Sequence, residues 1–157
     1  MLDFAVSSTE LSEGILPVYL EERASATKKI ALSQGIDEVF KYFNYIGQEH
    51  KIDESLQDKL FAPNFQMIIN GRVVVDGREH LTPHFQLLLD QVSRIDILIH
   101  EKIVANDSVV MRYDVEKPGK TTSKVIAIFK FDNGQVYEMN EVVFSVDPSK
   151  EVDFTSR

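Results

Sequence analysis

The chain has 157 residues, of which 43% are hydrophobic and 27% charged, a size and composition typical of one globular domain. It contains no cysteine, which excludes disulfides, thiolate metal ligands and thiol nucleophiles. A net charge of −8 argues against a general nucleic-acid or anionic-membrane surface, because both require clustered lysine and arginine. The sequence shows neither a membrane-length apolar run nor a secretory leader, so we expect a cytoplasmic protein.

The first 34 residues differ in character from the rest. Short apolar clusters alternate there with serine, threonine and charged residues, and Pro17 interrupts any single long helix. We expect residues 1–34 to form an N-terminal arm with one or two helical turns that packs on the body or on a partner. Residues 35–148 are predicted to form one domain, and residues 149–157 a C-terminal tail.

Two helices are predicted at the start of this domain. Apolar residues recur at helical spacing in residues 36–46, and Gly47 suits the C-terminal cap. A short second helix is predicted within IDESLQDKLF, residues 52–61, with Asp53 as its N-cap and with Leu56 and Leu60 facing inward.

Most of the remaining chain alternates with the period of a β-strand. Two short runs, residues 65–69 and 72–75, are joined by Asn70-Gly71, a strong hairpin signal. Four long strands with short turns then predict an antiparallel meander, over residues 94–104, 108–116, 123–131 and 135–146. Helices segregated against such a sheet make an α+β fold, in which a curved antiparallel sheet wraps the helices into a cone, a cystatin-like α+β roll.

A third helix precedes these four strands and carries His80 and His84 four residues apart. If Asp76 is the N-cap, both imidazoles lie on one helix face and Pro83 kinks the helix. If Thr82 is the N-cap, Pro83 takes the favoured first position and His80 falls in the preceding turn. A stable metal site would need a third ligand, and no other metal motif is present, so we expect no metal and no cofactor.

The element order and four segments resemble the nuclear transport factor 2-like superfamily, which includes SnoaL-like and ketosteroid isomerase-like proteins. The resemblance spans roughly residues 36–147, and its most specific part is the closing hairpin. The segments are KLFAPNFQMIING (59–71), DGREHLTPHFQLLL (76–89), SVVMRYDV (108–115) and VIAIFKFDNGQVYEMNEVVF (125–144). The resemblance implies a cone-shaped sheet, a small-molecule pocket at its mouth, and a homodimer formed through the outer sheet face.

The departures from ketosteroid isomerase are informative. The aspartate base of those enzymes is matched by Ile69, and their protonated aspartic acid by Ala127. Their tyrosine donor is matched by Tyr45 or by Tyr42, one turn earlier. Because an aliphatic side chain cannot abstract a proton, the resemblance does not extend to the isomerase mechanism.

The turn of residues 132–134 leaves two registers for the last hairpin. A two-residue turn at 133–134 places Phe129 opposite Glu138, whereas a three-residue loop places Phe129 on the same face as Tyr137. The resemblance favours the three-residue loop, which we adopt. It gathers one apolar face of Val125, Ala127, Phe129, Phe131, Tyr137, Met139 and Val143.

Glu141 is the one charge on that face. Desolvation there would raise the pKa of its carboxyl and suit it to acid–base catalysis. The alternatives are a solvated position at the rim or a pairing with a basic residue. We therefore take Glu141, His84 and Tyr45 as catalytic candidates. Core packing is the default role of the remaining candidates for lining the pocket, which are Tyr42, Phe61, Met67, Ile69, Phe85, Met111, Tyr113, Ala127, Phe129, Tyr137 and Met139.

Three functions remain open from the sequence. The leading hypothesis is a SnoaL-like pocket protein that binds a small hydrophobic ligand, with cofactor-independent isomerase, cyclase or dehydratase activity as its catalytic form. The alternatives are a non-catalytic ligand-binding or dimerisation module, and an accessory subunit resembling the small chain of ring-hydroxylating dioxygenases. We expect a homodimer formed by an outer sheet face of Ile126, Ile128, Val136, Val142 and Phe144.

Overall fold

A computed structural model of the chain describes residues 15–146; the first part of the expected arm and the predicted tail of residues 149–157 lie outside the described residues. The described part contains helices packed against one sheet, which confirms the α+β fold class. In chain order the elements are α2 (Ile15–Glu49), α3 (Glu54–Leu60), β1 (Phe61–Ile69), β2 (Arg72–Asp76), η1 (Arg78–His80), α4 (Leu81–Gln91), β3 (Asp96–Val104), β4 (Ser108–Glu116), β5 (Thr122–Asp132) and β6 (Gln135–Val146).

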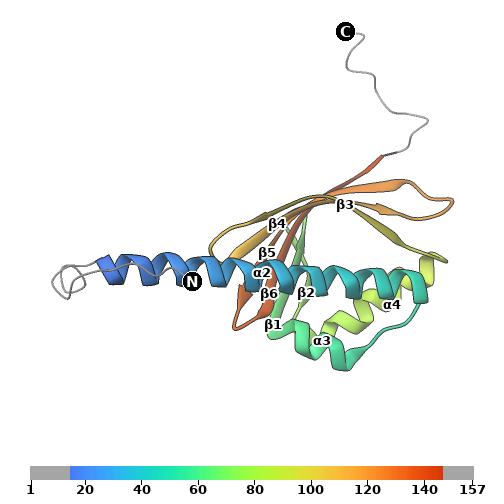
Figure 1. Cartoon of the computed structure of the whole chain (residues 1–157). Coiled ribbons are helices and arrows are strands. Elements are labelled where there is room, and N and C mark those ends of the chain that lie inside the picture. The colour runs from blue at the N-terminus through green and yellow to red at the C-terminus, as the bar shows by residue number, and fades with distance from the viewer. Residues whose placement is uncertain (1–14, 147–157) are drawn as a thin grey trace, which may run out of the picture.

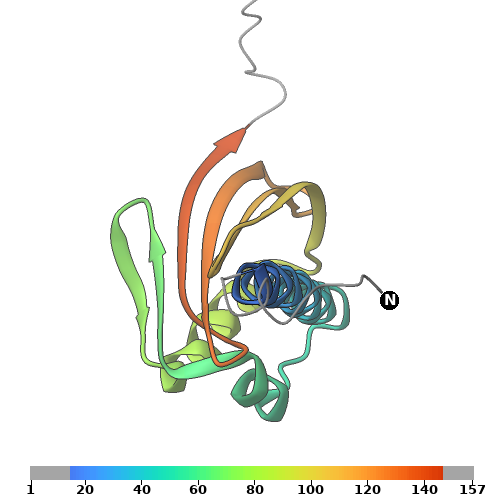
Figure 2. The ribbon, with the colours of Figure 1, turned by 60° about the vertical axis from the view of Figure 1, so that its left-hand side comes forward.

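The sheet has the strand order β2-β1-β6-β5-β4-β3. All neighbouring strands are antiparallel except β1 and β6, which run parallel, so the predicted four-strand meander is confirmed. The strands curl around α2, while α3 and α4 close one end of the resulting cone (Figures 1 and 2). This arrangement leaves one concave face inside the cone and one convex face outside it.

The helix α2 is longer than the sequence suggested. It runs unbroken through the predicted boundary between residues 34 and 35, so the expectation that Pro17 interrupts a long helix was wrong. Pro17 lies in the first turn, where its missing N–H has no carbonyl partner to lose. Almost all side chains of residues 16–31 are exposed, and burial begins at Leu32. The outer half of α2 therefore projects from the body instead of packing on it (Figure 1).

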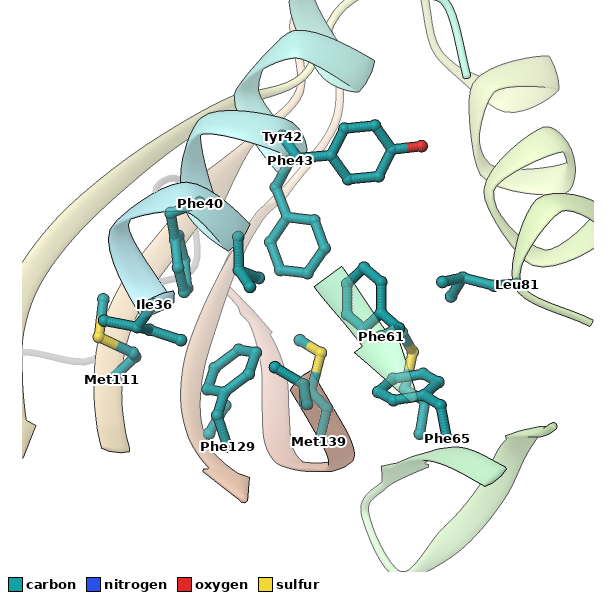
Figure 3. Close-up of a cluster of buried hydrophobic side chains, with 14 of the residues drawn as sticks. Ile36, Phe40, Tyr42, Phe43, Phe61, Phe65, Leu81, Met111, Phe129 and Met139 are labelled. Atoms are coloured by element: carbon teal, nitrogen blue, oxygen red, sulfur yellow. The ribbon is translucent and has the colours of Figure 1, made fainter. Parts of the chain in front are cut away.

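The core is built from aromatic rings between α2 and the sheet (Figure 3). Phe40 of α2 meets Phe129 of β5 edge-on, with ring centroids 5.5 Å apart, and Phe43 stacks on Phe61 at 6.2 Å. Each such pair adds about 1 kcal/mol to the apolar burial of its rings. These contacts fix the position of α2 over the concave face of the sheet.

The third helix begins differently from either predicted version. A turn of 3-10 helix, Arg78–His80, leads into α4, whose first residue is Leu81. Pro83 therefore lies in the first turn and breaks no hydrogen bond of the helix. His80 precedes α4 with its side chain 62% exposed beside Glu79, so the two histidines do not share a helix face.

The β5–β6 hairpin closes with a two-residue turn, so the expected three-residue loop was wrong. Asn133 and Gly134 both have positive φ, at 50° and 76°, and Asp132 pairs with Gln135. Positive φ at both central residues is the geometry that matches the twist of an antiparallel pair. A β-bulge at Tyr137 then adds one unpaired residue to β6.

The bulge places Glu141 on the concave face of β6, as the sequence predicted. The cause is the bulge at Tyr137 and not the three-residue loop that we expected. Beyond the bulge Phe129 pairs with Met139, and Ala127 pairs with Glu141, so Glu141 faces the concave side. Val136 lies before the bulge opposite Phe131 and is fully buried, whereas we had expected it on the outer face. The other residues expected there are 40–60% exposed, namely Ile126, Ile128, Val142 and Phe144.

Candidate functional site

A pocket of about 250 Å³ opens between the inner half of α2, α4 and the concave face of the sheet. Its walls are mostly aliphatic and aromatic, as in small-molecule sites generally. Both Glu141 and His84 line it. The predicted lining residues that also reach it are Met67, Ile69, Phe85, Tyr113 and Met139.

Glu141 is a buried carboxylate with one hydrogen-bond donor beside it. Its side chain comes from β6, its residue exposure is 8%, and the Tyr113 hydroxyl donates a 3.0 Å hydrogen bond to Oε1. Burial raises the pKa of Glu141 to about 7, although the hydrogen bond from Tyr113 acts in the opposite direction. At neutral pH the carboxyl group is therefore present in both its protonated and its ionised form.

The position of Glu141 in the sheet shows how the placement of the acidic residue in this chain differs from that in ketosteroid isomerases. Glu141 pairs with Ala127 of β5 on one side and with Ile69 of β1 on the other. Those are the two positions that match the isomerase acids. The carboxylate of this chain thus lies on the strand between them, at the same level of the sheet.

His84 approaches the pocket from α4. It is partly buried, and this burial lowers the pKa of its imidazole below the usual range for histidine. The ring is therefore neutral at pH 7, with one N–H donor and one nitrogen lone pair. A neutral imidazole on one wall and a titrating carboxyl on another can together hold and move a proton.

Tyr45 does not reach this pocket. Its side chain is on the exposed side of α2, 39% exposed, and its ring stacks on Tyr42 at 6.4 Å. The tyrosine hydroxyl that does reach the pocket is that of Tyr113. Tyr42 is buried, and its hydroxyl donates to Gln57 Oε1 at 2.8 Å.

Other expected lining residues belong to the core. They lie deeper between the helix and the sheet and form no part of the pocket wall: Phe61, Met111, Ala127 and Phe129. Tyr137, displaced by the bulge, lines a separate hollow near the β5–β6 turn.

Two polar residues of the pocket were not predicted. Lys117 follows β4, Ser123 lies at the start of β5, and the Lys117 ammonium donates a 3.2 Å hydrogen bond to Ser123 Oγ. No local sequence signal marks them, because they flank an ordinary polar turn between β4 and β5. Their place in the pocket depends on the curvature of the sheet.

No group of three or more histidine, aspartate or glutamate side chains within residues 15–146 is placed to hold a metal ion. No helix within the same range combines the length and the apolar character needed to cross a membrane.

Comparison with known families supports the resemblance seen in the sequence. The sequence model of the SnoaL-like domain matches residues 35–139, two thirds of the chain. The chain belongs to the SnoaL-like family. Its fold is that of the nuclear transport factor 2-like superfamily, as solved structures also show. No match was found among curated protein sequences.

Three solved structures illustrate the shared fold. A putative SnoaL-like polyketide cyclase from Jannaschia has a TM-score of 0.57 and 19% identity, covering 72% of this chain and 85% of that one. A putative isomerase from Rhodopseudomonas palustris has a TM-score of 0.58 and 14% identity, over 69% and 88%. A nuclear transport factor 2-like protein from Anabaena variabilis has a TM-score of 0.62 and 14% identity, over 76% and 92%. At these identities the likeness to this SnoaL-like protein concerns the fold alone.

Proposed function

We propose that this SnoaL-like protein binds a small hydrophobic molecule in its pocket and catalyses a cofactor-independent proton transfer, of the kind found in isomerisation, cyclisation or dehydration. The observation that supports this proposal is the buried Glu141 carboxyl, whose pKa is raised to about 7 in an apolar pocket. An acid–base group is most effective when its pKa lies near the working pH. The open pocket with polar groups on its wall favours this function over a purely structural module.

The reaction would begin at a carbon next to a carbonyl group of the ligand. The ionised Glu141 takes the proton from that carbon, the C–H electrons move to form an enolate, and the negative charge develops on the carbonyl oxygen. Neutral His84 donates its N–H to that oxygen. Glu141 then returns the proton to the same carbon, or to the γ-carbon of a ligand whose β,γ double bond has become conjugated in the enolate, while Tyr113 keeps the carboxyl group oriented.

This scheme differs from that of the ketosteroid isomerases in the source of the base. Ile69 and Ala127 supply only hydrocarbon at the two matching positions, so neither can accept or donate a proton. Glu141, which lies between them, supplies the carboxyl group instead. One titrating carboxyl and one neutral histidine thus take the place of two aspartic acids.

Hydrogen exchange on a model ketone tests this proposal. The probe is 2-tetralone in D₂O at pH 7, and proton NMR follows the loss of its α-hydrogens. The protein should accelerate exchange above the buffer rate, and Glu141→Gln should reduce that acceleration at least about 100-fold, the usual contribution of a general base. Glu138→Gln is the matched control, since Glu138 lies on the same strand, pairs with Lys130 and does not line the pocket.

Two results would contradict the proposal. One is a wild-type protein that leaves the exchange rate of 2-tetralone at the buffer value while the compound is shown to bind. The other is a Glu141→Gln variant that exchanges as fast as the Glu138→Gln control. Either would favour the alternative of a non-catalytic ligand-binding module.

We also propose that the protein is a homodimer formed by its convex sheet face. Four large apolar side chains of β5 and β6 are exposed there, which is unusual on a monomer surface. They are Ile126, Ile128, Val142 and Phe144, between 40% and 60% exposed.

A further inference from the structure

We propose that the ligand of the pocket is an apolar carboxylate, whose anionic end binds the Lys117 ammonium and the Ser123 hydroxyl. This inference rests on the proposed function, because it adds a second binding point to the same pocket. It assigns a ligand class, a hydrophobic organic acid, from the distribution of polar groups along the pocket wall.

The polar groups of the pocket are separated into two places. On β5, Ser123 lies four residues before Ala127, and Ala127 is the residue directly opposite Glu141. Four residues of strand span about 13 Å. Lys117 and Ser123 thus lie at one end of the pocket, and Glu141 with its Tyr113 donor lies at the other.

The wall between these two places is hydrocarbon. Val125 separates Ser123 from Ala127 on the concave face of β5, and its partner on β6 is Val143. On β4, Val115 lies opposite Ser123, and Tyr113 lies opposite Val125 with its hydroxyl directed to Glu141. A ligand that spans this distance must therefore have an apolar middle. Its two ends meet different chemistry, a cation at one end and a titrating carboxyl group at the other.

The charge of Lys117 is available to a ligand. Among the described residues that line the pocket, it is the one lysine or arginine, and its hydrogen-bond partner, Ser123, is neutral. No carboxylate within residues 15–146 forms an ion pair with it, whereas Lys102, Lys124 and Lys130 each contact an acidic side chain. A partly enclosed ammonium without a carboxylate partner favours a ligand that brings one.

Ser123 is suited to the same anion. It is 8% exposed, and it accepts a hydrogen bond from Lys117, so its own proton is directed elsewhere. A carboxylate placed beside both groups would receive two hydrogen bonds, one of them charge-assisted. A neutral amide of the same shape would gain much less from the ammonium.

Two compounds of the same shape but different charge distinguish the contribution of ligand charge to the affinity from that of ligand shape. Isothermal titration calorimetry at pH 6 would compare 2-naphthoate, an anion at that pH, with the neutral 2-naphthamide. Wild type should bind the anion more tightly than the amide. Lys117→Met should weaken 2-naphthoate at least about tenfold, as expected for the loss of a charge-assisted hydrogen bond, and should change 2-naphthamide less than about twofold.

The controls are chosen from the same turn. Lys120→Met removes a lysine of equal charge that does not line the pocket, and it should leave both affinities unchanged. Lys117→Arg should retain the preference for the anion, and Ser123→Ala should reduce it more weakly than Lys117→Met does. Thermal melts of each variant would verify folding.

The proposal is overturned if wild type binds the two compounds equally, if it binds neither, or if Lys117→Met preserves the preference for 2-naphthoate. If only the proposed catalysis fails, the two experiments give a different combination of results. In that case Lys117-dependent binding of 2-naphthoate persists, and the acceleration of exchange on 2-tetralone is absent.

Discussion

The Tyr113 hydroxyl donates its proton to the Glu141 carboxylate across 3.0 Å, and both side chains are almost completely enclosed. Burial raises the pKa of Tyr113 well above its ordinary value, and the nearby Glu141 charge raises it further. The phenol is therefore protonated and a donor near neutral pH, where Glu141 is the member of the pair that titrates. The hydrogen bond holds the two side chains in one relative orientation.

Replacement of Glu141 by glutamine should change how stability depends on pH. Because the pKa of Glu141 rises on folding from 4.5 to about 7, the folded state is favoured relative to the unfolded state while the group is protonated. This stability is fully present below about pH 4.5, is lost as the pH rises through about 7, and amounts to roughly 3 kcal/mol. Glu141→Gln should lack this loss, as urea unfolding from pH 4 to 8 would show; parallel curves for the two proteins would refute the assignment.

Removal of the Tyr113 hydroxyl should move the titration of Glu141 upward. The hydrogen bond from Tyr113 lowers the pKa of Glu141, so Tyr113→Phe should raise the midpoint above 7. The loss of the hydrogen bond should also destabilise the protein by about 1 kcal/mol. Carbon-13 NMR of the glutamate carboxyl groups would follow the midpoint directly. An unchanged or lower midpoint would show that the phenol is not a donor to this carboxyl in solution.

A methyl group at Gly47 should force α2 away from the start of β3. A Cβ built there would overlap the Ile95 carbonyl oxygen, and the Gly47 carbonyl already accepts a 3.0 Å hydrogen bond from Ile95 N–H. We expect Gly47→Ala to cost about 1–3 kcal/mol in urea unfolding, beyond the small gain in helix propensity.

The matched control for this variant is Gly35→Ala. It lies on the same helix, and its nearest contact would be the movable ring of Phe131 at 3.2 Å. Its stability should remain within about 1 kcal/mol of wild type. Equal effects of the two substitutions would argue against the close approach at Gly47.

A charge on the convex face should dissociate the proposed dimer. Val142 is 60% exposed there, so Val142→Glu should leave the fold intact and shift the mass measured by light scattering from twice the chain mass to the chain mass. Leu20→Glu is the control, because Leu20 is an exposed residue on the projecting half of α2. If Leu20→Glu dissociates the dimer and Val142→Glu does not, the interface is the helix instead of the sheet.

The fold could be predicted from the sequence because its signals are local. Strand alternation, Asn70-Gly71 and the apolar period of residues 36–46 each identify an element without knowledge of its neighbours. The outer half of α2 was not predicted because we took Pro17 as a helix breaker, although the residues that follow it favour a helix. In the structure Pro17 occupies the only turn of a helix that tolerates it.

The pocket residues were harder to predict than the fold, because their positions depend on the register between neighbouring strands. No glycine in the sequence indicates the bulge at Tyr137. The bulge nevertheless determines which face of β6 carries Glu141. The partnership of Tyr113 with Glu141 requires the registers of three strands at once. The choice of Tyr45 failed because its neighbour Tyr42, three residues earlier on α2, occupies the inward position.

β6 is an interior strand, bonded to β1 on one side and to β5 on the other. Its central amides should therefore be among the slowest in the molecule to exchange with solvent, since they open only when the whole sheet does. The carboxyl group of Glu141 stands on this rigid frame. A ligand that enters the pocket therefore meets a carboxyl group whose backbone is held by hydrogen bonds on both sides.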